Sequence, residues 1–236
     1  MRTLYPLLLL AVISSWAQAQ VTFTDVTASA GQGLGEGTSR SISWVDFNND
    51  GLLDLYLPTA GNVPNKLYRN NGDGTFTEVA ALVGLNDLTN TITSSWADFD
   101  NDGDLDLVTT ATAASTKLWR NNLIPGNDTT FTDITASAGI SMTGAQMPAW
   151  ADYNLDGYLD FYSPISNSST QADALYRNNH DATFTNVADS AGVNHQVSGL
   201  LEQGVHWGDY NKDGYPDLFI GNLQTGGPSF FHRNNG

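Results

Sequence analysis

The chain has 236 residues, with 25 acidic and nine basic residues, a net charge of −16 and no cysteine. The shortage of Lys and Arg argues against a nucleic-acid binder, because phosphate contacts need basic side chains. The lack of cysteine excludes disulfides, thiolate zinc sites and thiol catalysis. A hydrophobic fraction of 40% is too high for a disordered acidic chain, and only 14% of the residues are charged, so the positions of the acids are informative.

The start of the chain has the pattern of a secretory signal peptide. Arg2 precedes an apolar run, Leu7–Ile13, and Ala17 and Ala19 form a small-x-small cleavage site before Gln20. The alternative is a membrane anchor, but the run is shorter than the ~20 residues that span a bilayer. We therefore predict that residues 1–19 are removed. The mature chain would then have no membrane span and would be secreted, periplasmic or held at the cell surface.

The rest of the chain repeats itself four times, with approximate bounds 22–74, 75–129, 130–182 and 183–236. An Asp two residues after a Trp recurs at intervals of 52, 54 and 57 residues. Three sets of markers keep the same order in the repeats: the tryptophans Trp44, Trp96, Trp150 and Trp207; the arginines Arg69, Arg120, Arg177 and Arg233; and the segments Thr22–Val26, Thr75–Val79, Thr130–Ile134 and Thr183–Val187.

Each repeat contains about four short runs rich in β-branched and aromatic residues, separated by Gly, Asn and Asp. In the first repeat we predict strands at Ser41–Phe47, Leu53–Pro58, Lys66–Arg69 and Thr75–Val79. No segment has a sustained helical period. A four-stranded unit of about 50 residues is typical of a β-propeller blade, and the alternative is a β-sandwich or an extended β array. In a propeller, the repeated Trp and Phe or Tyr residues would pack between adjacent blades.

The acidic residues concentrate in one loop of each repeat, numbered here from its first Asp. Alternate residues of such a loop can direct oxygens to one centre, and an invariant Gly at position 6 permits a positive φ. The predicted ligands are the side chains at positions 1, 3, 5 and 9 and the main-chain carbonyl at position 7. They are Asp46, Asn48, Asp50, Leu52 and Asp54; Asp98, Asp100, Asp102, Asp104 and Asp106; Asp152, Asn154, Asp156, Tyr158 and Asp160; and Asp209, Asn211, Asp213, Tyr215 and Asp217.

A shell made only of oxygens predicts Ca²⁺, which takes 6–8 oxygen ligands at ~2.3–2.6 Å. An EF-hand would need a Glu at position 12, and position 12 is Leu57, Thr109, Ser163 or Ile220. The loops are therefore predicted to lie within β-hairpins. Four copies in register predict about four bound calcium ions, whereas a single Asp-rich turn would be weak evidence.

The loop and its flanking segments resemble a known family. An Asp-x-(Asp/Asn)-x-Asp-Gly-x-x-Asp loop inside a β repeat resembles the FG-GAP/VCBS repeat, the blade of integrin-α-type propellers. The order of the segments Thr22–Val26, Trp44–Leu55 and Leu67–Phe76 resembles bacterial relatives of the cartilage acidic protein (ASPIC/UnbV) family. The resemblance implies an all-β propeller with structural calcium and usually more blades than four, about seven in all, with no enzymatic activity of its own.

No catalytic motif accompanies the repeats: the four histidines are scattered, and no nucleophile elbow, phosphate-binding loop or zinc signature is present. We expect a non-enzymatic protein that serves adhesion or recognition of extracellular protein or glycan partners. The alternative is a non-catalytic accessory domain of an exported enzyme, such as one that degrades polysaccharides. Segments that differ between repeats are the expected ligand sites: Ala60–Pro64, Asn86–Thr91, Asn167–Ala172 and Asn194–Gln203.

The two ends of the repeat array leave two alternatives. A strand at Thr22–Val26 could pair with Phe231–Arg233 and close a ring of four blades. Alternatively, the four repeats belong to a larger propeller, and the family resemblance favours this second interpretation.

Overall fold

The computed structural model describes residues 21–31, 39–61, 63–111, 115–165, 172–195, 202–223 and 227–236. The predicted signal peptide, residues 1–19, lies outside this part of the chain. Among the described residues, no helix combines the length and the apolar character needed to cross a membrane.

The described chain is all-β apart from three single-turn helices, and its strands form four antiparallel sheets in chain order. The first sheet contains β1 (Ser43–Val45), β2 (Asp54–Leu57), β3 (Lys66–Asn70) and β4 (Phe76–Glu78). The second contains β5 (Thr91–Ala97), β6 (Asp106–Ala111), β7 (Lys117–Asn121) and β8 (Phe131–Asp133). The third contains β9 (Ala149–Ala151), β10 (Asp160–Ser163), β11 (Ala174–Asn178) and β12 (Phe184–Asn186). The fourth contains β13 (Glu202–Gly208), β14 (Asp217–Asn222) and β15 (Phe230–His232).

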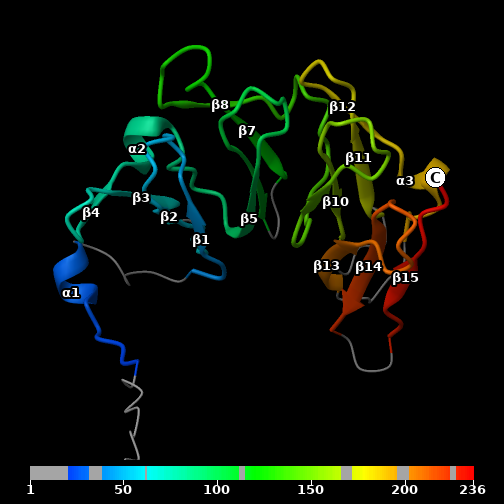
Figure 1. The fold of residues 1–236 in the computed structure, drawn as a ribbon, viewed down its shortest axis with the longest axis horizontal. Helices are drawn as coiled ribbons and strands as arrows, with labels where there is room; N and C mark the ends of the chain where they lie inside the picture. Colours follow the sequence, from blue (N-terminus) through cyan, green and yellow to red (C-terminus); the bar gives the residue numbers. More distant parts are fainter. Residues whose placement is uncertain are drawn as a thin grey trace, which may run out of the picture.

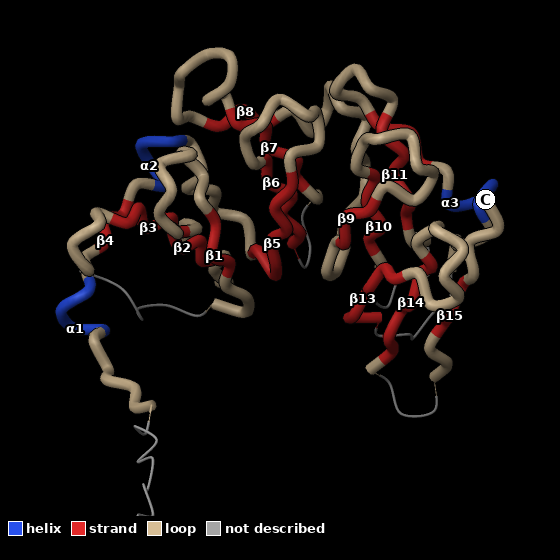
Figure 2. The backbone as a smooth tube through the Cα atoms, viewed as in Figure 1, coloured by secondary structure: helices blue, strands red, loops and turns tan. Residues whose placement is uncertain are grey.

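The sheets are arranged as propeller blades. Each is a meander whose strands pair in chain order, and the first strands of consecutive sheets, β1 with β5, β5 with β9 and β9 with β13, lie in contact. Figure 1 shows the sheets following one another along an open arc, and Figure 2 shows loops at both ends of the strands. This confirms the predicted all-β fold with propeller-type blades. The sheets are offset by one strand from the repeat bounds, because β4, β8 and β12 begin a repeat yet pair with the preceding sheet.

One expectation about local structure was wrong. Thr22–Val26 was predicted to be a strand, but it is exposed and forms no strand, and Phe23 is 97% exposed. It therefore does not pair with Phe231–Arg233, and the closed ring of four blades is not formed. Three segments rich in small residues form the single-turn helices α1 (Thr27–Ala30), α2 (Ala80–Val83) and α3 (Ala188–Ala191).

The hydrophobic core lies between the sheets, in three clusters that each join two consecutive blades. Trp96 of the second sheet packs edge-on against Tyr56 of the first, with ring centroids 5.5 Å apart. Trp150 stacks on Phe99 at 6.4 Å, and the indole of Trp207 donates a 3.1 Å hydrogen bond to the carbonyl of Ala149. These contacts confirm the predicted packing between blades for Trp96, Trp150 and Trp207, but not for Trp44, which is 57% exposed and contacts Phe76 of its own blade.

A repeated asparagine adds a polar link between the blades. The side-chain amide of Asn121, at the end of β7, donates to the carbonyl of Phe47 in the first blade at 2.8 Å. The equivalent Asn234 donates to the carbonyl of Tyr153 at 2.7 Å. These links could not be predicted from the sequence, because nothing in a single repeat reveals an acceptor in the preceding one. Each link fixes an Asp-rich loop against the following blade.

Candidate metal centre

All four Asp-rich loops are wound by the same hydrogen bonds. In the first loop, the carboxylate of Asp46 accepts the amide of Asp50 at 3.0 Å and the amide of Gly51 at 2.9 Å. The same two bonds recur in the other three loops, at 2.8–3.1 Å, where Asp98, Asp152 and Asp209 accept. The carboxylate at position 1 therefore organises the loop.

The backbone confirms why position 6 is Gly. Gly51, Gly103, Gly157 and Gly214 have φ values of 84°, 98°, 89° and 94°, in the left-handed region that side chains resist. Position 4 is also left-handed, with φ between 55° and 64°, although its residues are Asn49, Asn101, Leu155 and Lys212. Two left-handed residues within three positions wind the chain tightly enough for alternate side chains to face one centre.

The carboxylate at position 9 is buried in every loop: Asp54, Asp106 and Asp160 are 0% exposed and Asp217 is 1% exposed. Asp106 accepts the amide of Asn121 at 2.8 Å and the amide of Phe99 at 3.2 Å. The equivalent bonds recur in the other three loops. This Asp therefore joins the metal-type loop to the end of the third strand of its own blade.

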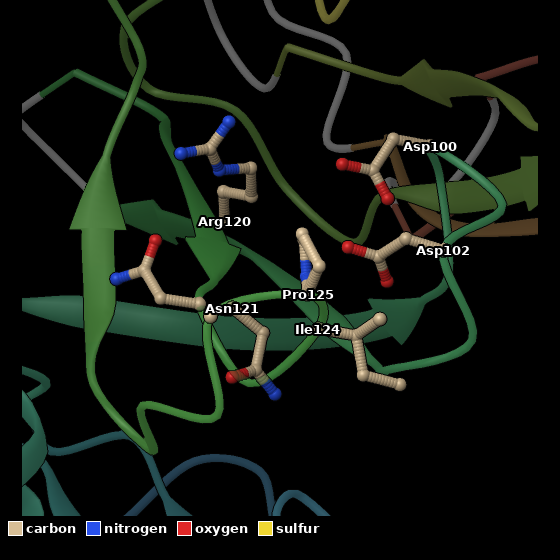
Figure 3. A pocket seen from close by; sticks show the side chains of 8 residues that line it. Asp100, Asp102, Arg120, Asn121, Ile124 and Pro125 are labelled. Atoms are coloured by element: carbon tan, nitrogen blue, oxygen red, sulfur yellow. The ribbon is translucent and has the colours of Figure 1, made fainter.

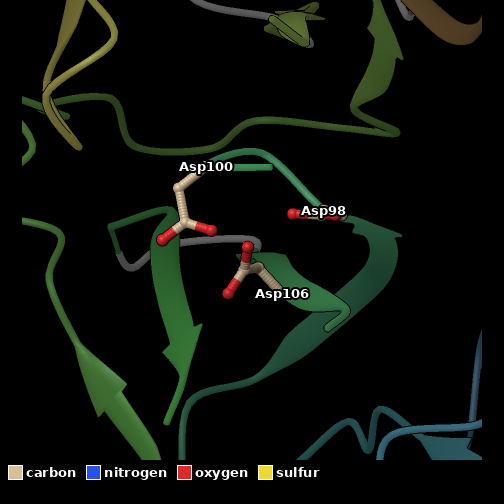
Figure 4. Close-up of side chains that lie close together, drawn as sticks. All are labelled: Asp98, Asp100 and Asp106. Atoms are coloured by element: carbon tan, nitrogen blue, oxygen red, sulfur yellow. The ribbon is translucent and has the colours of Figure 1, made fainter. Parts of the chain in front are cut away.

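In the second loop, three carboxylates converge. Asp98, Asp100 and Asp106 each offer an oxygen, and these oxygens all lie within 4.8 Å of one another (Figure 4). Oδ1 of Asp100 is buried and accepts no hydrogen bond from any described residue. A group of three acidic oxygens with one unpartnered member is the kind of donor set that a hard cation binds.

Burial, together with the smaller effects of the neighbouring Asp100 and Asp104, raises the pKa of Asp106 to about 9. In the equivalent loops, burial raises the pKa of Asp54 to about 6 and that of Asp160 to about 7. Carboxylates that lose solvation without gaining a basic partner are unfavourable in their charged form. A bound cation would remove this cost. The cost is largest in the second loop, where the pKa of Asp106 is raised furthest.

The other three loops differ at position 3, where Asn replaces Asp. The side-chain amides of Asn48, Asn154 and Asn211 donate to the carboxylate at position 5, at 2.9, 2.8 and 2.7 Å. In the described residues these loops hold no triad of carboxylates comparable to that of the second loop. The predicted ligands at positions 1, 3, 5 and 9 share one turn in every loop, but only in the second do three carboxylates come together.

At position 7 the sequence predicted only main-chain ligands. The amides of Leu52, Asp104, Tyr158 and Tyr215 each donate to the Asp at position 5, at 2.9–3.0 Å, so ligation by their carbonyls remains a prediction. Asp104 also has a side-chain role that was missed. It is 1% exposed, its Oδ2 accepts the amide of Ile124 at 2.8 Å, and burial raises its pKa to about 6. It holds the connection between β7 and β8 against the second loop.

That connection forms one wall of a cavity of about 380 Å³ beside the second loop. Figure 3 shows Asp100 and Asp102 on one side and Arg120 facing them across the cavity. The cavity is lined by Asp100, Asp102, Arg120, Asn121, Asn122, Ile124, Pro125 and Gly126. The sequence carries a signal of this cavity that was overlooked: nine residues lie between Asn121 and Phe131, against five between Asn70 and Phe76.

The segments that were expected to hold ligands are only partly described, because residues 62, 166–171 and 196–201 lie outside the described ranges. In the described part of the first segment, Gly61 donates its amide to Asn90 at 3.0 Å. Two of the variable segments, Ala60–Pro64 and Asn86–Thr91, are therefore in contact with each other. The cavity of about 380 Å³ lies beside the second Asp-rich loop, and neither of these two segments lines it.

Comparison with known proteins gives three similarities. A family model described as FG-GAP-like repeat matches residues 58–109, which include the triad of Asp98, Asp100 and Asp106. Human cartilage acidic protein 1 is 30% identical over 167 residues, which cover 70% of this chain and 25% of that protein. The solved structure of an Agrocybe aegerita lectin that recognises non-reducing terminal N-acetylglucosamine is similar with a TM-score of 0.41 and 21% identity. That match covers 81% of this chain and 51% of the lectin chain. The chain thus spans about a quarter of the human relative and about half of the lectin.

Proposed function

The chain is an FG-GAP repeat protein, and on this premise we propose that it is an exported, calcium-binding recognition module for extracellular glycan or protein partners. The observation that carries the proposal is the cavity beside the second loop, where the triad of Asp98, Asp100 and Asp106 lies next to Asp102 and Arg120. In this function the blades serve adhesion or recognition, and they carry out no catalysis.

Calcium is the ion that the donor set favours. Every predicted ligand is an oxygen, and Ca²⁺ accepts more protein oxygens and less regular geometry than Mg²⁺. In the second loop, the ligands of the ion would come from Asp98, Asp100, Asp102, Asp104 and Asp106. The Asn-containing loops would bind their ions with fewer negative charges. Ions at such sites would stabilise the blades, and each would contribute on the order of 1 kcal/mol at millimolar Ca²⁺.

Recognition of a glycan is supported by the chemistry of the cavity wall. Arg120 offers hydrogen-bond donors, Asp100 and Asp102 offer acceptors, and Ile124 and Pro125 offer an apolar surface. Sugars present hydroxyl groups at their edges and C–H groups on their faces, so a cavity with both kinds of lining suits them. Export is supported by the sequence pattern of residues 1–19.

The test is binding to an array of immobilised glycans in calcium and in EGTA. We expect calcium-dependent binding that is weakened by Arg120→Ala. The matched control is Arg177→Ala, because Arg177 is an exposed arginine at the same position of the third blade and lines none of the cavities described here. Absence of binding to any glycan, or binding that ignores both EGTA and R120A, contradicts glycan recognition at this site. Calcium binding is measured separately by calorimetry and can succeed when glycan binding fails.

A further inference from the structure

Three side chains that depart from the repeat meet where the third and fourth sheets adjoin: Asp173, His195 and His232. Their equivalence to residues of other blades is fixed by hydrogen bonds and register. The amide of Asp173 donates to the carbonyl of His195, as Asn65 does to Asp87 and Thr116 to Met142. His232 pairs with Leu218 at the register position where the other blades have the buried aromatics Tyr68, Trp119 and Tyr176.

The three side chains form a chain of contacts that starts at a buried carboxylate. Asp173 is 1% exposed; its Oδ1 accepts the amide of Ile165 at 2.8 Å, and its Oδ2 accepts the hydroxyl of Tyr162 at 2.5 Å. The same Oδ2 lies 3.1 Å from Nδ1 of His195. Nε2 of His195 in turn lies 3.0 Å from Nε2 of His232. The imidazole of His195 is held in place by stacking on Phe230, with ring centroids 3.9 Å apart.

The carboxylate determines which nitrogen of His195 carries the proton. Nδ1 faces Asp173 and therefore donates, which leaves the lone pair of Nε2 directed at His232. A carboxylate that orients the far nitrogen of a histidine in this way is the usual outer-shell partner of a metal-binding imidazole.

We propose that Nε2 of His195 and Nε2 of His232 bind one divalent transition-metal ion, such as Zn²⁺, at the junction of the third and fourth sheets. Two metal–nitrogen bonds of ~2.0–2.1 Å that span the observed separation subtend an angle of about 95° at the ion. This angle suits two adjacent ligands, with water in the remaining positions. The site is separate from the Asp-rich loops, and it is independent of the proposed recognition of glycans.

The position that His195 occupies in the fold carries a contact between neighbouring blades elsewhere in the chain. At the junction of the first and second sheets, the equivalent residue Asp87 forms a 3.2 Å ion pair with Lys117 of the next blade. At the junction of the third and fourth sheets, His195 stands where Asp87 stands and stacks on Phe230, which occupies the position of Lys117, while His232 lies two residues further along β15. His232 also lines a cavity of about 480 Å³, through which an ion can reach it.

The test is a titration of the full chain with Zn²⁺ in calcium-saturated buffer, so that the Asp-rich loops are occupied. We expect one Zn²⁺ per chain in the wild type and at least a tenfold weaker affinity in His232→Tyr. That variant introduces the residue that stands at this position in the first and third blades. Asp173→Asn should weaken binding by about 10–100-fold through the outer shell. His206→Gln, which changes an exposed histidine of β13, is the matched control and should bind Zn²⁺ like the wild type.

The Co²⁺ form supplies a second readout, because its visible absorption bands report nitrogen ligands and should disappear in H232Y. A calcium-dependent melting curve that matches the wild type establishes that a variant is folded. If H232Y does not fold, His195→Gln provides the test of zinc binding in its place. Equal Zn²⁺ affinity in the wild type, H232Y and H195Q, or no binding to the wild type, overturns the proposal. Either result would mean that the two imidazoles share only a hydrogen bond.

Discussion

The side-chain amide of Asn178 donates a 2.8 Å hydrogen bond to the main-chain carbonyl of Phe99, although 79 residues separate the two in sequence. The same amide group donates to the carbonyl of Leu159 in its own blade at 3.2 Å. One buried asparagine thus ties the end of β11 both to its own Asp-rich loop and to the loop of the preceding blade. This relationship links blade packing to the candidate metal sites.

Asn178→Ala should lower the free energy of unfolding by about 1–3 kcal/mol, because two buried carbonyls lose their donor. Asn70→Ala is the matched control. Asn70 makes the equivalent bond to Leu53 in its own blade, and its side-chain oxygen likewise accepts an amide two residues ahead. The excess loss in N178A over N70A, measured by urea denaturation, reports the link between blades. Equal losses would mean that this link adds nothing.

Trp96→Ala should cost roughly 3 kcal/mol, as expected when a large aromatic side chain is removed from a packed interior. Trp96 contacts Tyr56 of the first blade and Phe131 of its own blade. Trp44 stands at the same repeat position, but it is 57% exposed and contacts Phe76 of its own blade. Trp44→Ala should therefore cost far less than W96A in the same denaturation experiment. A similar loss in both variants would contradict packing between blades as the source of stability.

In EGTA, the melting temperature should fall as the pH rises from about 5.5 to 8. The folded, metal-free chain raises the pKa of Asp54 to about 6, of Asp160 to about 7 and of Asp106 to about 9, whereas an unfolded Asp titrates near about 3.9. The folded state therefore binds more protons than the unfolded state in this window, so its stability decreases with pH. The carboxyls with lowered pKa, such as Asp73 and Asp213, act only below about pH 4 and do not interfere.

In calcium the same scan should show the opposite trend. Protons compete with the ion for the carboxylates, so the stabilisation by calcium should grow with pH. The two melting curves should diverge towards pH 8, and calorimetry at several pH values measures the difference. Curves that stay parallel across this range would contradict a cation site built on these buried carboxyls.

Asp106→Asn should have opposite effects with and without calcium. In EGTA near neutral pH it removes a carboxyl that is costly to bury charged, so the melting temperature should stay level or rise. In calcium the variant loses a ligand of the triad and should be less stable than the wild type by on the order of 1 kcal/mol. Asp128→Asn controls for charge, because Asp128 is exposed and, among the described residues, accepts only the amide of Thr130. If D106N and D128N respond alike to calcium, Asp106 is not a ligand.

Much of this structure could be predicted from the sequence, because the same pattern of residues occurs in each of the four repeats. The recurrence of the Trp, Asp and Gly of the first loop at matched intervals predicted the blades, the packing of Trp96, Trp150 and Trp207 between blades, and the positive φ at the loop glycines. Thr22–Val26 was misjudged because it has the composition of a last strand, yet a strand forms only where a neighbour offers hydrogen bonds, and none lies beside it in the described chain.

The sequence by itself determined the properties that depend on local spacing: the order of the strands, the winding of the Asp-rich loops and the choice of oxygen as the donor. Only the tertiary structure decided which carboxylates converge and which side chains meet across blades. The triad at Asp100 and the pair of His195 and His232 depend on contacts between residues far apart in sequence. Such contacts arise from the way whole sheets pack, because each blade covers the hydrophobic face of the next and brings its loops with it.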